Sequence, residues 1–155
     1  MQSETVQAAA LRPLPATFAS LPAQANEYQL LGVLPPPAAS DYEKEAVSAL
    51  SALILGRELY VNVIQRVEKV GHVLAFDDKS IDVADSPNNV SQSINARIVE
   101  LGLGVVEKKR ERYLAPLISK LIASQEDAQS RRTNIWEYGD ISSDDAREFG
   151  YSRRF

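Results

Sequence analysis

The sequence predicts an α+β fold, in which short strands and three helices share one hydrophobic core. The first observation is the order of the periodic segments, β-α-β-β-β-α-(β)-α, with short strands mixed among the helices. The second is the length, because 155 residues correspond to one domain, or one domain plus a fragment. The third is composition, since 45% hydrophobic and 25% charged residues are ordinary for a globular protein.

The first segments of the chain predict a linker followed by a strand. Residues 1–24 contain scattered prolines among alanines and serines and show no sustained period, which indicates a linker or the end of another domain. Residues 27–33 (EYQLLGV) form a short apolar run. Because three prolines stop this run at 35–37, it predicts a single strand.

A helix is predicted to begin at Ser40 and to end at Gly56. Ser40 and Glu43 have the spacing of a capping box, in which two side chains satisfy free N–H groups of the first turn. Glycine is a common residue just past a helix end. The expected buried face follows helical spacing and contains Tyr42, Ala46, Val47, Leu50, Leu53 and Ile54.

The middle of the chain predicts two strands, a hairpin and a second helix. Alternation over residues 59–67 predicts a strand with an apolar face of Leu59, Val61, Val63 and Val67. Residues 72–76 predict another strand, and the polar turn at 77–80 predicts a hairpin to residues 81–83. A helix over 90–101 has an expected buried stripe of Val90, Ile94, Ile98 and Leu101. Its cap is predicted to be Ser86, Asn88 or Asn89.

The last part of the chain predicts a short strand at 103–106 and a long helix at 115–132. Pro116 is tolerated only in the first turn of a helix, which sets the start. Trp136 and Tyr138 are expected near the domain body, as a hydrophobic plug rather than a ligand cage. Residues 139–155 have little apolar content and predict a flexible tail.

Composition excludes several classes of function. The chain has no cysteine, which excludes disulfides, thiolate metal sites and a cysteine nucleophile. The net charge of −4 gives no global signature of nucleic-acid binding. No apolar run approaches the ~20 residues that a bilayer requires, and the N-terminus lacks the basic segment of a signal peptide. No membrane partner is therefore expected, and the cytosol or the nucleus is the expected location.

Several segments resemble a known family. Residues 95–136 (NARIVELGLGVVE…AQSRRTNIW) resemble the C-terminal half of staphylococcal nuclease-like domains, in which a long last helix closes on an N-I-W motif. Residues 27–36 (EYQLLGVLPP) resemble the strand before the active-site loop of those domains. The stretch FASLPAQANEYQLLGV and the ending NIWEYGDISSDDAREFGYSRRF are similar to the extended Tudor region and the C-terminus of the Tudor–staphylococcal nuclease family.

The resemblance implies a fold and a division of the chain. Domains of this family are small β-barrels of the OB type, so it implies a partial OB-type barrel with three packed helices. Residues 1–24 would be the linker or end of a Tudor module, 25–138 the nuclease-like lobe and 139–155 the tail. The Tudor core and the first strands of the lobe would lie upstream in the same polypeptide.

The resemblance also implies that the nuclease chemistry is lost. Phosphodiester hydrolysis needs carboxylates that hold a hard cation and arginines that stabilise charge on the phosphate. The matching positions hold Gln29 and Val70 instead of arginines, Leu34 instead of a metal-binding aspartate, and Pro37 instead of a glutamate. We therefore expect no catalytic residue, no metal ligand and no cofactor, and interpret the chain as a degenerate nuclease lobe.

Basic residues around the last helix are the candidate nucleic-acid contacts. Local basicity on an acidic chain can follow a nucleic-acid backbone, and Tyr113 could stack on a base. The alternative is a solvated charged surface, because Glu107 and Glu111 are interleaved. The candidate backbone contacts are Lys108, Lys109, Arg110, Arg112, Arg131 and Arg132.

Other polar residues have structural explanations that we favour. His72 could be a metal ligand or a base, but no metal partner has suitable spacing, so it is interpreted as a strand residue at a hairpin edge. Asp77 and Asp78 could bind a cation, yet they suit a turn. The tail lacks the glycine and glutamate positions of a calcium loop, which leaves solvated charge as the explanation of Asp140, Asp144 and Asp145.

Two functions from different classes remain as expectations. The first is a non-catalytic lobe that supports a Tudor module and binds RNA and proteins of ribonucleoprotein complexes. The family's association with RNA silencing, RNA metabolism and transcriptional coactivation implies these settings. The second is a metal-dependent ribonuclease, whose catalysis would belong to other nuclease-like repeats of a longer protein. The four replaced positions favour the first.

Overall fold

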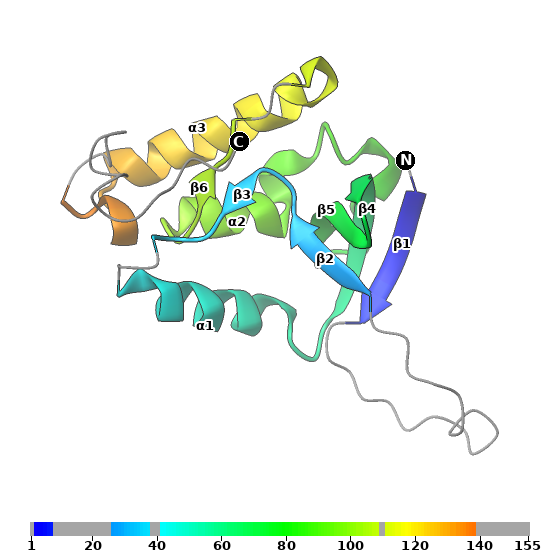
Figure 1. Cartoon of the computed structure of the whole chain (residues 1–155), viewed down its shortest axis with the longest axis horizontal. Helices are drawn as coiled ribbons and strands as arrows, with labels where there is room; N and C mark the ends of the chain where they lie inside the picture. Colours follow the sequence, from blue (N-terminus) through cyan, green and yellow to red (C-terminus); the bar gives the residue numbers. More distant parts are fainter. Residues whose placement is uncertain (1, 8–25, 38–40, 109–110, 139–155) are drawn as a thin grey trace.

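The computed structural model describes residues 2–7, 26–37, 41–108 and 111–138, and Figure 1 shows its arrangement. Three α-helices gather beside a four-stranded sheet, which confirms the mixed α+β class with a partly open sheet. Most of the predicted linker and the whole predicted tail, residues 139–155, lie outside the described residues. Within the described part, no helix is long and apolar enough to cross a bilayer.

The four-stranded sheet has the order β1-β4-β5-β2. Its strands are β1 (Gln2–Gln7), β4 (Glu58–Val67), β5 (Val70–Phe76) and β2 (Glu27–Leu30). Strand β4 runs antiparallel to β1 and to β5. Strand β2 runs parallel to β5, with Glu27 opposite Val70 and Gln29 opposite His72. Strands β1 and β2 therefore form the two edges of the sheet.

Strand β1 lies within the segment 1–24, for which the sequence predicts a linker. It runs along β4 from Gln2, opposite Val63, to Gln7, opposite Glu58. An edge strand of this kind is held by main-chain hydrogen bonds, which need no apolar alternation in the sequence. The composition of this segment therefore does not predict strand β1.

The predicted hairpin between residues 72–76 and 81–83 was wrong, because the first strand pairs with a different strand. Strand β5 pairs with β4 through a turn at Glu68 and Lys69, where Glu68 adopts a left-handed φ of 56°. Beyond β5, the structure has a 3-10 helix (Val83–Asp85) instead of a strand at 81–83. The Asp82 carboxylate caps this helix by accepting the N–H of Ala84 at 2.9 Å. A capping side chain thus stabilises helical turns at this point.

Two irregularities break the predicted alternation of the strands. A bulge between Val63 and Gln65 shifts the register of β4, and Val67 is exposed instead of buried. At Gly32, with a φ of +74°, the predicted single strand of 27–33 divides. Its continuation β3 (Val33–Leu34) pairs with β6 (Val105–Val106) in a second sheet. A Cβ atom at Gly32 would lie 2.8 Å from Cδ1 of Ile118, so a side chain would be crowded there.

The three helices are α1 (Tyr42–Ile54), α2 (Ile94–Glu100) and α3 (Ala115–Ser130), with α2 between the others (Figure 1). Helix α3 begins as predicted, with Pro116 in its first turn. Helix α2 is shorter than predicted, because residues 90–92 form a separate 3-10 helix. Its cap is Ser93, which is none of the three predicted residues and accepts the N–H of Ala96 at 3.1 Å.

Helix α1 departs most from its predicted packing. It begins at Tyr42 after Asp41, whose side chain makes no cap bond, and Ser40 of the predicted capping box lies outside the described residues. None of its residues is fully buried, and Val47, placed on the buried face by the sequence, is 63% exposed. Leu101 at the end of α2 is also exposed. The main core is instead formed by the sheet with α2 and α3, and includes Leu31, Val73, Leu74, Phe76, Ile94 and Leu121.

Candidate nucleic-acid interface

The four positions that the family resemblance matches to nuclease catalytic residues lie on or next to three strands. Gln29 is exposed on β2, and Val70 is the half-buried first residue of the adjacent strand β5. Leu34 is half-buried at the end of β3, and Pro37 is buried just beyond it. Two apolar side chains, one proline ring and one neutral amide therefore occupy these positions.

These residues do not fit a hard divalent cation. Such a cation takes several oxygen ligands, mostly carboxylates, and here only the Gln29 amide offers a side-chain oxygen. Across the described ranges, no three His, Asp or Glu side chains come together in a group that could hold a metal.

The candidate basic residues fall into two groups separated by α3. Lys108 and Arg112 are exposed before the helix, and Arg131 and Arg132 are exposed after it. The helix has 16 residues, which places its two ends about 24 Å apart. Lys109 and Arg110 lie outside the described residues. The two groups therefore do not form one continuous patch.

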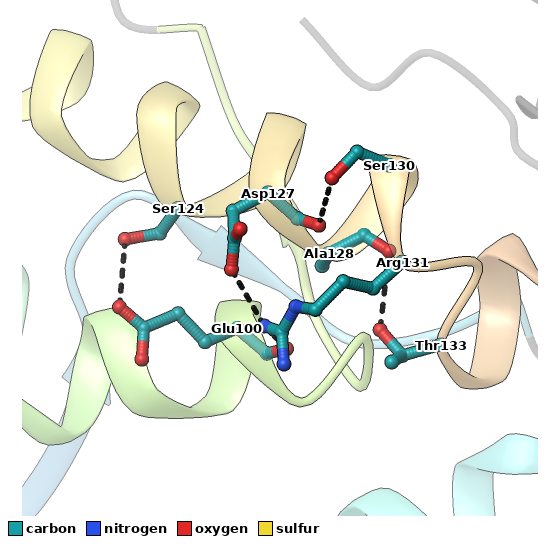
Figure 2. Close-up of polar contacts among 7 residues, drawn as sticks. All are labelled: Glu100, Ser124, Asp127, Ala128, Ser130, Arg131 and Thr133. Atoms are coloured by element: carbon teal, nitrogen blue, oxygen red, sulfur yellow. Dashed lines mark hydrogen bonds and ion pairs between the residues drawn. The ribbon is translucent and has the colours of Figure 1, made fainter.

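Arg131 is engaged in the junction between α2 and α3 (Figure 2). Its guanidinium lies 2.7 Å from the Asp127 carboxylate and donates to the main-chain carbonyl of Glu100 at 3.1 Å. The Glu100 side chain in turn accepts the hydroxyl of Ser124 at 3.2 Å. These contacts tie the end of α3 to the end of α2, so Arg131 has a structural explanation.

The N-I-W motif closes the same end of the molecule. The N–H of Ile135 donates to the carbonyl of Gly102 at 3.2 Å, and the Asn134 amide donates to the carbonyl of Leu101. Trp136 is 3% exposed and packs with Ala128 and Ile135. Tyr138, in contrast, is 92% exposed. The predicted plug is confirmed for Trp136 and wrong for Tyr138.

Asp78 is held by turn bonds as predicted, whereas Asp77 is held by an arginine of α2. Arg97 donates to the Asp77 carboxylate at 2.8 Å, and this hydrogen bond lowers the pKa of Asp77 against the opposing effect of burial. The Asp78 carboxylate accepts the N–H and the hydroxyl of Ser80 at 2.8 and 2.7 Å, which lowers its pKa. A bond from α2 therefore accounts for the Asp77 carboxylate, and local turn bonds account for that of Asp78.

The structure brings together four polar side chains that sequence reasoning did not connect, in a row across the sheet that includes Gln29. Gln29 on β2 lies opposite His72 on β5, and His72 lies opposite Gln65 on β4. The hydroxyl of Tyr113, which precedes α3, donates to Oε1 of Gln65 at 3.2 Å. We call these four residues the polar row. The bulge in β4 sets its register, and no sequence signal reveals the bulge.

With this geometry, the chain belongs to the family of staphylococcal nuclease homologues, which it matches over residues 21–138. It is 33% identical over 146 residues to Staphylococcal nuclease domain-containing protein 1 of Drosophila melanogaster, covering 94% of this chain and 15% of that protein. It is 28% identical over 160 residues to Ribonuclease TUDOR 2 of Arabidopsis thaliana, covering 92% of this chain and 15% of that protein.

A solved structure also supports the similarity to Tudor–staphylococcal nuclease proteins. The chain is similar to the extended Tudor domain of Drosophila melanogaster Tudor-SN (p100), with a TM-score of 0.63 and 27% identity. The match covers 79% of this chain and 53% of that one. The resemblance to Tudor–staphylococcal nuclease proteins is therefore confirmed, and the chain spans about 15% of the length of the curated relatives it matches.

Proposed function

We propose that this chain is a non-catalytic binding lobe of a Tudor–staphylococcal nuclease protein. It would contact RNA and proteins of ribonucleoprotein complexes, with a Tudor core packed upstream in the same polypeptide. The supporting observation is the set of residues at the catalytic positions. Gln29, Leu34, Pro37 and Val70 supply neither a carboxylate nor a guanidinium group.

The physical cost of these replacements supports a binding role over catalysis. Losing one preorganised electrostatic group typically lowers a rate by ~10²–10³. Here two arginine positions and two acidic positions are replaced, so no useful rate remains by this mechanism. OB-type folds commonly bind single-stranded nucleic acid, and that role needs no catalytic residue. RNA silencing, RNA metabolism or transcriptional coactivation, in the cytosol or the nucleus, is the proposed setting.

A second candidate function is metal-dependent ribonuclease activity. The observation that favours it is that two relatives are named Ribonuclease TUDOR 1 and Ribonuclease TUDOR 2. In this case catalysis would belong to other nuclease-like repeats of a longer protein. This chain would then contribute binding or support to an enzyme.

Incubation of the purified chain with single-stranded RNA and DNA, in the presence of calcium or magnesium, tests the proposal. We expect salt-dependent RNA binding by fluorescence anisotropy and no cleavage. A variant with Asp77→Asn and Asp78→Asn, purified in parallel, is the control for a contaminating nuclease. Metal-dependent cleavage that co-purifies with the chain and disappears in this variant contradicts the non-catalytic role. Absence of binding at low salt contradicts the RNA-binding role.

A further inference from the structure

None of the four residues of the polar row belongs to the buried core. Gln29 is exposed on an edge strand, and Tyr113 is 65% exposed. His72 and Gln65 are half-buried between them. Neighbouring strands are about 4.8 Å apart, so the backbones at Gln29 and Gln65 are separated by about 10 Å. A surface of this width can accommodate one or two ligand groups of the size of a nucleobase.

The chemistry of the row suits the edges and faces of bases. A carboxamide has both donors and an acceptor, and glutamine pairs with the edge of an adenine through two hydrogen bonds. Single-stranded RNA is recognised in this way, with unstacked bases lying on aromatic rings and hydrogen-bonded along their edges. Tyr113 supplies the ring, and the bond from its hydroxyl to Gln65 fixes the ring's position before a ligand arrives.

The charges around the row argue against recognition by phosphate alone. The exposed cations on the neighbouring segments are Arg66, Lys69, Lys108 and Arg112. They are matched by Glu27, Glu68, Glu107 and Glu111, so the described surroundings carry almost no net charge. The row itself contains neither a carboxylate nor an ammonium or guanidinium group. A ligand that binds here would gain its affinity from stacking and neutral hydrogen bonds.

We propose that the polar row binds one or two unstacked bases of single-stranded RNA. A base stacks on Tyr113, and the amides of Gln65 and Gln29 bond to base edges. This inference rests on the proposed RNA-binding function and adds the surface and the part of the nucleotide that is recognised. It also assigns a use to the face from which the catalytic arginine is absent.

The test compares a labelled oligouridine or oligoadenosine with an abasic oligomer of the same length, by fluorescence anisotropy. The unaltered chain should prefer the base-containing oligomers. Tyr113→Ala should weaken their binding by about 5- to 150-fold, the range expected for loss of one stacked base. Tyr113→Phe keeps the ring and should retain most of the affinity. Tyr138→Ala removes an exposed tyrosine at the other end of α3 and should change nothing.

Two further variants, Gln29→Ala and Gln65→Ala, should reduce the preference for base-containing over abasic RNA. Urea unfolding of each variant shows whether the fold is retained. We expect the Tyr113 and Gln29 variants to keep the fold, because both side chains are exposed. The inference is overturned if the chain binds abasic and normal oligomers equally, or if Tyr113→Ala binds like the unaltered chain. The proposed RNA-binding function survives that result, whereas absence of any RNA binding overturns both. A protein ligand lost on Tyr113→Ala, with RNA binding unchanged, also overturns the inference.

Discussion

Asn95 shows how one side chain can hold three segments of this chain together. It is fully buried on α2, accepts the N–H of Ala75 at 3.1 Å, and donates to the carbonyls of Leu31 and Val73 at 3.0 Å each. A buried polar group without a partner costs about 1–3 kcal/mol, so these bonds are needed for the amide to be tolerated. They also secure the chain next to Gly32, where it passes from one sheet to the other.

Gly102 fixes the position of the N-I-W motif. It has a φ of +66°, and a Cβ atom there would collide with the carbonyl of Thr133. Gly102→Ala should therefore lower the free energy of unfolding by about 1–3 kcal/mol. Gly56→Ala is a matched control, because Gly56 has a φ of +70° but a Cβ atom there would meet nothing within 4 Å. Equal losses for the two variants in urea titrations would contradict the role of the close approach to Thr133.

Trp136 is the buried aromatic residue of the N-I-W motif and packs with Ala128 and Ile135. Replacing a buried tryptophan by alanine typically costs about 3–5 kcal/mol, and we expect Trp136→Ala to lose an amount in this range. Tyr138→Ala should have little effect, since that side chain is almost fully exposed. Chemical denaturation measures both. A loss below about 1 kcal/mol for Trp136→Ala would show that the closure is wrong.

The bond from Arg97 gives Asp77 a pH-dependent role. The pKa of Asp77 in the folded state lies below its ordinary value of 3.8. The bond between Asp77 and Arg97 therefore stabilises the fold fully above pH 3.8, and this stabilisation is lost as the pH falls through the folded-state pKa. The difference in unfolding free energy between the unaltered chain and Asp77→Asn should therefore narrow in acid. Arg97→Gln should show the same narrowing, and the double variant should add little. A difference that is constant with pH would contradict this account.

At the scale of elements, α3 acts as a spacer between the two basic groups. The segment before it carries Lys108 and Arg112, while Arg131 after it is already committed to Asp127 and Glu100. Because the first group takes no part in this junction and the second does, they should respond differently to neutralisation. Of the two basic groups, only the one before the helix is then expected to contribute to RNA binding.

Neutralising the first group tests this separation. Replacing Lys108, Lys109, Arg110 and Arg112 by glutamine should weaken RNA binding equally for all sequences. It should also reduce the slope of log K against log salt by up to about 0.7 for each phosphate that the chain no longer neutralises. Arg132→Gln is the control and should leave the slope unchanged. An unchanged slope in the fourfold variant would remove this segment from the binding surface.

At the scale of the whole molecule, the buried face of the longest helix was predictable, whereas local backbone features were not. The buried face of α3, with Leu117, Ile118 and Leu121, follows directly from helical spacing. The division at Gly32 depends on packing partners distant in the sequence. The cap at Ser93 follows from the separate 3-10 helix at 90–92, which the helical spacing does not reveal. At the candidate site, the replaced catalytic positions follow from the family resemblance. The polar row depends on strand register, which residue composition does not specify.

The parallel pairing of β2 with β5 also has a consequence for the order of folding. The hairpin of β4 and β5 is local, whereas α1 and β4 separate β2 from its partner β5 in the sequence. Contacts between distant segments require closure of a long loop, so they tend to form late. We expect Leu30→Ala on β2 to speed unfolding with little effect on the folding rate, and Val73→Ala on β5 to slow folding. Stopped-flow measurements in urea would separate the two cases, and slower folding of Leu30→Ala would show that the parallel pair forms early.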